Sequence, residues 1–143
     1  MKYYAVIDTN VIVSSMLKHD SIPGEILDLV ISKTIVPLLN KEIIDEYEEV
    51  LKRNKFGFTH TEVDNLIASI KANSIFLERE QTLEEFVDED DIVFYEIVMS
   101  ARHTMDAFLI TGNIKHYPIR NYIVTPKQMI EIISSRPINP KLS

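Results

Sequence analysis

The chain has 143 residues, of which 45% are hydrophobic and 26% charged, and this size and composition suit a single folded domain with one core. It contains no cysteine, which excludes disulfides, thiolate nucleophiles and cysteine-based zinc sites, and its net charge of −7 argues against nucleic-acid binding through a broadly basic face. No apolar run reaches the ~20 residues of a membrane span, and the N-terminus lacks the basic and apolar blocks of a signal peptide. We therefore expect one domain over residues 1–143, located in the cytoplasm and away from membranes.

The predicted elements alternate between strands and helices along the chain. Short apolar runs predict strands at residues 3–7, 35–39, 108–110 and 122–124. Helical spacing and helix-start residues predict helices at residues 23–32, 41–53, 61–72, 90–101 and 126–134. Strands that are apolar throughout are typical of a parallel sheet buried on both faces. The alternation therefore predicts an α/β fold, a three-layer sandwich with a central parallel sheet flanked by helices.

The first predicted strand is followed directly by Asp8, in the stretch VIDTNVIVSSML. Ligands of parallel α/β sheets bind beyond the carboxyl ends of the strands, which favours a functional role for Asp8. Aspartate is also a common cap where a strand leads into a helix, so its position leaves both roles open. A phosphohydrolase with an aspartyl nucleophile at Asp8 would need a second aspartate two positions on, and Asn10 stands there instead.

Five acids lie in the stretch NKEIIDEYEEVLKR, which is expected to form an amphipathic helix. Glu46 and Glu48 each lie about 40° from the nearest apolar residue of the buried arc, so either could point into a cleft between helix and sheet. The other three acids lie farther from that arc. Periodicity does not decide between Glu46 and Glu48.

Two later segments also carry side-chain oxygens that could act as ligands. Four consecutive acids, residues 88–91, precede an apolar helix, where the helix dipole favours negative charge. Four acids are more than capping needs, and Asp91 lies closest to the buried body of the helix. Thr111 and Asn113 follow a buried strand and supply neutral oxygens at its carboxyl end.

These residues together predict a cation site. Clustered carboxylates repel one another, and a bound divalent cation offsets that repulsion. Ligation by oxygen alone favours Mg²⁺ or Mn²⁺ over Zn²⁺. Such a cation can activate water and stabilise charge on a phosphodiester, so even an acidic chain can act on nucleic acid.

The chain resembles the PIN-domain family, in the subgroup of toxins from toxin–antitoxin modules. The resemblance covers nearly the whole chain and rests on four stretches in order: VIDTNVIVSSML, NKEIIDEYEEVLKRNKF, DEDDIVFYEIVMSA and DAFLITGNIKHYP. It implies a metal-dependent endoribonuclease that hydrolyses RNA with a metal-activated water. A protein antitoxin and a homodimer are the further partners that it implies.

The resemblance also assigns residues to the site. Asp8, Glu46 and Asp91 match the catalytic acids that would coordinate Mg²⁺ or Mn²⁺, which selects Glu46 over Glu48 and leaves Asp90 as the alternative to Asp91. We expect these three carboxylates to converge in one cleft, within reach of a common cation.

Asn113 stands where many PIN domains have a fourth acid. Asn113 can still donate its carbonyl oxygen to the metal, but a neutral amide removes one negative charge, so we expect weaker binding of a second metal. This departure motivates the alternative of a catalytically weak or inactive PIN-like domain that binds RNA or protein. Lys115, His116 and Arg120 follow closely and are candidates for phosphate contacts. The supporting candidates at the site are Asn10, Asp90, Thr111 and Lys115.

Overall fold

A five-stranded parallel sheet forms the centre of the computed structural model, which describes residues 1–135. The strand order is β3-β2-β1-β4-β5, and every neighbouring pair is parallel. Ile7 pairs with Ile110, so β1 and β4 end together at the same edge of the sheet. The strands are β1 (Tyr3–Ile7), β2 (Ile35–Leu39), β3 (Ile75–Phe76), β4 (Ala107–Ile110) and β5 (Ile123–Val124).

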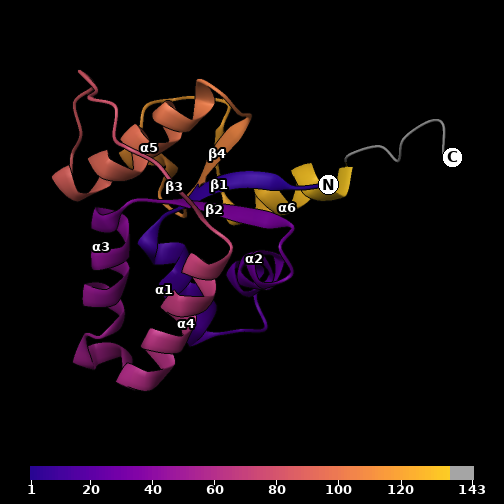
Figure 1. Cartoon of the computed structure of the whole chain (residues 1–143), viewed down its shortest axis with the longest axis vertical. Helices are drawn as coiled ribbons and strands as arrows, with labels where there is room; N and C mark the ends of the chain where they lie inside the picture. Colours follow the sequence, from indigo (N-terminus) through magenta and orange to yellow (C-terminus); the bar gives the residue numbers. More distant parts are fainter. Residues whose placement is uncertain (136–143) are drawn as a thin grey trace, which may run out of the picture.

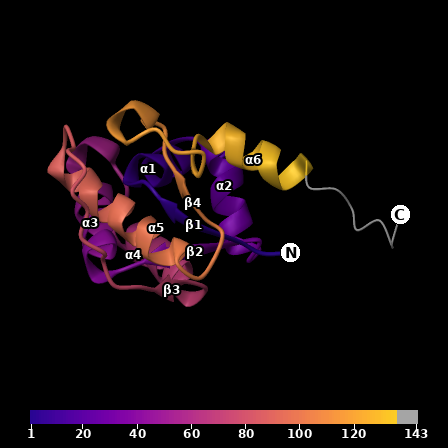
Figure 2. The same cartoon turned by 90° about the horizontal axis from the view of Figure 1, so that it is seen from above.

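Six helices in the described residues flank this sheet and confirm the predicted three-layer α/β sandwich. In Figure 1, α5 lies above the sheet, and α1 to α4 lie below it. Figure 2 shows α6 beside α2, which it contacts. The helices are α1 (Thr9–Leu17), α2 (Ile22–Ile31), α3 (Lys41–Leu51), α4 (His60–Ala72), α5 (Ile92–Arg102) and α6 (Pro126–Ser135). Short 3-10 turns lie at Asn54–Phe56, Glu89–Asp91 and Ile114–His116.

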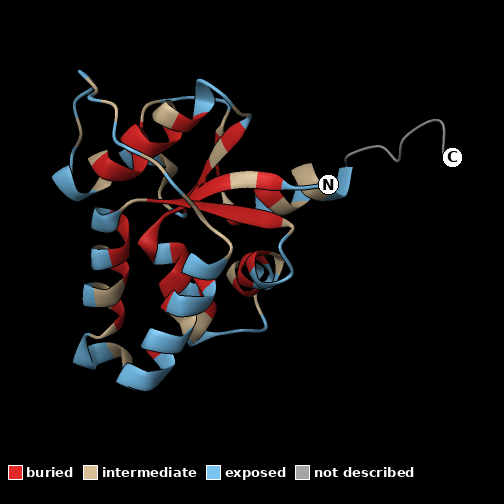
Figure 3. Ribbon diagram, in the orientation of Figure 1, coloured by how far each residue is buried: buried red, intermediate tan, exposed pale blue. Residues whose placement is uncertain are grey.

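The hydrophobic core lies on both faces of the sheet. All five residues of β2 are buried, as are four of the five in β1. Figure 3 shows that α3 turns its exposed side outward and its buried side toward the interior of the molecule, where it packs against α1 and α4. This double burial explains why the strands are apolar at successive positions rather than at alternate ones.

Helix α1 and strand β3 are absent from the elements that the sequence predicts. Polarity does not follow burial along α1, because Thr9 and Ser15 are buried while Leu17 is exposed, so its helical periodicity is weak in the sequence. Strand β3 has two residues, too few to form a pattern. The predicted helix at residues 90–101 begins instead at Ile92, because Glu89–Asp91 forms a 3-10 turn.

None of the helices in residues 1–135 combines the length and apolar character needed to cross a membrane. The predicted domain runs to residue 143, and its last eight residues lie outside the described part of the chain.

Candidate active site

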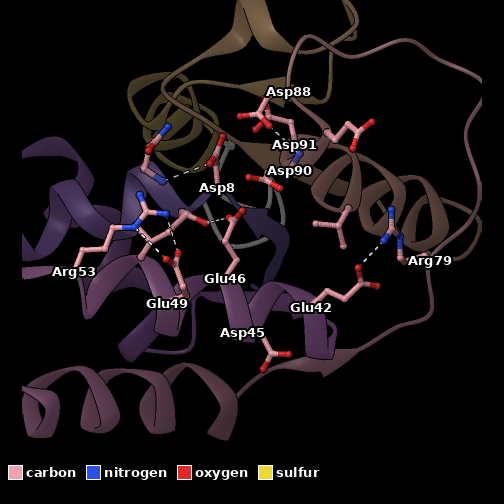
Figure 4. Close-up of a pocket in the computed structure, with 15 residues that line it drawn as sticks. Asp8, Glu42, Asp45, Glu46, Glu49, Arg53, Arg79, Asp88, Asp90 and Asp91 are labelled. Carbon is pink, nitrogen blue, oxygen red and sulfur yellow. Dashed lines mark hydrogen bonds and ion pairs between the residues drawn. The ribbon is translucent and has the colours of Figure 1, made fainter.

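An acidic cleft of about 500 Å³ lies beyond the carboxyl end of β1, between α3 and the turn that leads into α5. Figure 4 shows acids of these three regions around one space, with Arg53 and Arg79 at its two ends. Asp8, Glu46 and Asp91 all line it, so residues far apart in sequence share one cleft. The acids that line the cleft are Asp8, Glu42, Asp45, Glu46, Glu49, Asp88, Glu89, Asp90 and Asp91.

Asp8 occupies the junction between β1 and α1. Its backbone N–H donates to Ile110 O at 2.9 Å, which continues the pairing of β1 with β4. One carboxylate oxygen, Oδ2, accepts from Thr111 Oγ1 at 2.8 Å and from Tyr117 OH at 3.2 Å. Within residues 1–135, the other oxygen, Oδ1, accepts only from the Asn10 backbone N–H, at 3.4 Å. Asp8 is thus both the N-cap of α1 and a buried acid with one weakly bonded oxygen.

Glu46 is oriented by a residue of the neighbouring helix. Thr9 Oγ1 donates a short hydrogen bond to Glu46 Oε2. Burial raises the pKa of Glu46 to about 7, and the negative charges of Asp8, Asp90 and Asp91 add to this rise, while the Thr9 hydrogen bond opposes it. Glu46 is therefore held in an environment that disfavours its own charge.

The geometry of α3 separates Glu46 from Glu48. Tyr47 is fully buried, and its hydroxyl donates to Ile7 O, which ties α3 to the end of β1. Glu46, one residue earlier, lines the cleft. Glu48 is not among the cleft residues and pairs with Lys52 at 3.0 Å. Of the two glutamates that periodicity left open, only Glu46 lines the cleft.

Asp91 ends the 3-10 turn before α5 and makes no side-chain capping bond to that helix. Its Oδ1 accepts from Tyr117 OH at 3.4 Å. Its Oδ2 is buried without a hydrogen bond and lies 3.3 Å from His116 Nδ1, an ion pair when the imidazole is protonated. Burial raises the pKa of Asp91 to about 6, with further contributions from Asp8 and Asp88, and His116 opposes the rise. The alternative, Asp90, also lines the cleft and is more exposed than Asp91.

The carboxylate oxygens of the cleft suit a hard divalent cation chemically, but their spacing does not form a ready set of ligands. Glu46 and Asp91 each have one oxygen held by a protein hydroxyl. The second oxygen of Asp91 lies 3.3 Å from His116 Nδ1, and that of Glu46 makes no hydrogen bond within residues 1–135. Oxygen donors with mutually raised pKa values suit Mg²⁺ or Mn²⁺. Across residues 1–135, however, no three acid or histidine side chains are arranged to hold one ion. The three carboxylates line one cleft, and their joint binding of a single cation stays a prediction.

The residues after β4 serve other contacts. Thr111 is fully buried and donates its hydroxyl proton to Asp8. Asn113 lies in a separate depression with Gly112, and only Asn10 lines both that depression and the acidic cleft. The metal-binding role of Asn113 stays a prediction.

The cations predicted for phosphate contacts do not line the cleft. Lys115 is exposed outside it, and Arg120 pairs with Glu84 at 2.6 Å. Among the described residues, the basic side chains that line the cleft are Arg53 and Arg79. Arg79 is engaged by Glu42 and Glu96 at 2.6 Å each, so Arg53 is the more available of the two.

Sequence reasoning missed Thr9 and Tyr117. Thr9 adjoins Asp8 in the first quoted stretch, so its place beside the cleft could have been inferred from that neighbour. Tyr117 lies 109 residues from Asp8 in sequence, and its spacing gives no sign of the contact. Only the fold brings its hydroxyl to the acids.

Comparison with known proteins gives two findings. A family model described as PIN domain matches residues 4–115, which include all three catalytic candidates. The chain is also 27% identical over 146 residues to MJ1680, an uncharacterized protein of Methanocaldococcus jannaschii, and the match covers 92% of each chain.

Proposed function

The chain belongs to the PIN domain family, whose members are in general nucleases, and on this premise we propose that it is a metal-dependent ribonuclease acting through Asp8, Glu46 and Asp91. Mg²⁺ or Mn²⁺ bound there would lower the pKa of a bound water and stabilise negative charge on the RNA phosphodiester.

One observation carries the proposal: three acids from separate elements line one cleft, and two of them have raised pKa values. The pKa of Glu46 is about 7 and that of Asp91 about 6, chiefly through burial and then through neighbouring carboxylates. Such perturbed acids in a cleft are typical of functional sites. A purely structural cluster would instead be expected to pair these acids with lysine or arginine.

The surrounding residues orient the acids. Thr9 holds one oxygen of Glu46, and Thr111 holds one oxygen of Asp8. These neutral donors fix the carboxylates without neutralising them, so their charge stays available to a cation. His116 lies beside Asp91 and shields part of its charge when protonated.

The direct test is RNA cleavage by the purified chain. We expect a panel of structured RNAs to be cut with Mg²⁺ or Mn²⁺ and to stay intact after EDTA treatment, with activity restored when the cation is added back. Cleavage that persists unchanged in EDTA would contradict the metal-dependent mechanism.

A second candidate is a PIN-like domain that binds RNA or protein with little or no cleavage. The lack of a preformed three-acid site within residues 1–135 favours it, as does the neutral Asn113. RNA binding without cleavage under every cation condition would support this candidate over the ribonuclease.

We propose the toxin half of a cytoplasmic toxin–antitoxin pair as the biological role, supported by the resemblance of the four stretches to that subgroup. Expression in a bacterial host is expected to arrest growth, and co-expression of a small neighbouring open reading frame is expected to relieve it. A homodimer is part of the same proposal, and light scattering of the purified chain would measure it. Growth that is unaffected by expression of an RNA-cleaving chain would refute the toxin role while leaving the chemistry intact.

Arg53→Gln is expected to raise KM for RNA about tenfold while changing kcat less. The Arg53 side chain is half exposed at the cleft and pairs with Glu49 at 2.8 Å, so it can offer a charge-assisted contact to a phosphate. Lys115→Gln removes the same charge outside the cleft, and we expect its KM to change less than about twofold. Steady-state kinetics would measure both, and equal effects of the two substitutions would contradict a phosphate contact at Arg53.

A further inference from the structure

We propose that Tyr117 is a positioning residue that holds Asp8 and Asp91 together and thereby sets the affinity of the cleft for a divalent cation. This inference rests on the proposed function and adds a residue to it. The Tyr117 hydroxyl lies 3.2 Å from Asp8 Oδ2 and 3.4 Å from Asp91 Oδ1. It thus connects the end of β1, which carries Asp8, with the turn before α5, which carries Asp91.

The hydroxyl is suited to this role because it is a neutral donor. Tyr117 is 6% exposed, and its phenol hydroxyl donates a hydrogen bond without carrying a positive charge. A single proton is shared between two carboxylates, so Tyr117 holds both acids without adding a positive charge beside them. A lysine or arginine at this place would instead neutralise the acids and compete with a cation.

The contact also selects which oxygens stay available. Tyr117 and Thr111 both donate to Oδ2 of Asp8, which leaves Oδ1 with one long hydrogen bond. Tyr117 donates to Oδ1 of Asp91, while Oδ2 is buried and lies 3.3 Å from His116 Nδ1. Tyr117 therefore anchors one oxygen of each acid and leaves the second oxygen, Oδ1 of Asp8 and Oδ2 of Asp91, outside this contact. Outer contacts of this kind typically change metal affinity about 10- to 100-fold when removed.

Packing fixes the ring that carries the hydroxyl. Phe86 meets Tyr117 edge to face, with ring centroids 5.9 Å apart, and contacts Tyr95 on its other side at 5.4 Å. The Tyr117 backbone N–H also donates to Ile114 O at 3.0 Å. The hydroxyl is therefore held in place independently of the acids, which is the property of a positioning group rather than of a ligand that follows them.

Tyr117→Phe tests the proposal because it removes the hydroxyl and keeps the ring. We expect the dissociation constant for Mn²⁺, measured by calorimetry on the full chain, to rise about tenfold. Tyr95→Phe is the matched control, since it removes a hydroxyl from the same aromatic cluster, and that hydroxyl is hydrogen-bonded with Tyr122. We expect its Mn²⁺ affinity to equal that of the wild type, with melting temperatures of both variants recorded alongside.

The outcomes separate this inference from the proposed function. If the wild type binds Mn²⁺, Asp8→Asn abolishes binding, and Tyr117→Phe binds as tightly as the wild type, the positioning role of Tyr117 is refuted. The same holds if Tyr95→Phe weakens binding as much as Tyr117→Phe, because the effect would then be general loosening. If the wild type itself binds no Mn²⁺, the proposed metal-dependent function fails first.

Discussion

Asp8→Asn is expected to lower the rate of RNA cleavage by at least about 1000-fold, which corresponds to a loss of ~4 kcal/mol of transition-state stabilisation. Thr111 and Tyr117 both donate to Oδ2 of Asp8. An asparagine would therefore keep its carbonyl oxygen at that place and turn its amide NH₂ into the cleft. A hydrogen-bond donor would then stand where the proposed ligand oxygen Oδ1 stood, and it would repel a cation. Single-turnover cleavage of a labelled RNA would measure the loss.

The matched control is Asp45→Asn, which removes a carboxylate from the rim of the same cleft. The Asp45 side chain is 57% exposed and pairs with Lys41 at 2.7 Å, and Figure 4 shows it pointing away from the other acids. We expect its cleavage rate to stay within about threefold of the wild type, because exposed pairs contribute little. Equal activity of Asp8→Asn and the wild type would remove Asp8 from the catalytic site, and equal losses in both variants would point to a general effect of charge.

The sequence predicts the fold well because each strand is apolar at successive positions. β1 and β2 have the predicted bounds, and the parallel sheet with helices on both sides follows from the alternation. α1 is the exception, because polar residues of this helix are buried and Leu17 is exposed, which blurs the contrast between its faces. β3 is paired only at two residues of an edge strand, so tertiary pairing rather than local sequence defines it.

The site is predictable only where the chain itself positions a residue. Asp8 follows from the end of β1, since the strand direction fixes where its carboxyl end lies. Glu46 could not be separated from Glu48 by periodicity, because the choice depends on how α3 sits against β1, and Tyr47 determines that contact. The hydroxyl of Tyr117 depends on the path of the chain after β4, which no local pattern encodes.

Glu46→Gln is expected to stabilise the cation-free protein and to reduce cleavage at least about 100-fold. The pKa of Glu46 is raised from 4.5 to about 7 in the folded chain, chiefly by burial. Below pH 4.5 the Glu46 side chain is protonated in both the folded and the unfolded state, so its favourable contribution to the free energy of unfolding is fully present. As pH rises through about 7, the folded protein must also lose that proton, and the contribution disappears. Glutamine carries no charge at any pH, so the Glu46→Gln variant does not lose this stability as pH rises.

The difference in melting temperature between Glu46→Gln and the wild type should therefore grow with pH. In EDTA we expect it to be near zero at pH 4.5 and to reach about 2–5 °C in favour of the variant at pH 8, a value reduced because Glu46 is only half buried. Glu48→Gln is the matched control, since Glu48 lies on the same helix, pairs with Lys52 and does not line the cleft. Its melting temperature should differ from that of the wild type by less than about 1 °C at pH 8. A Glu46→Gln variant that is no more stable than the wild type at pH 8 would show that Glu46 is not held against the other acids, and the candidate site would then lose its second member.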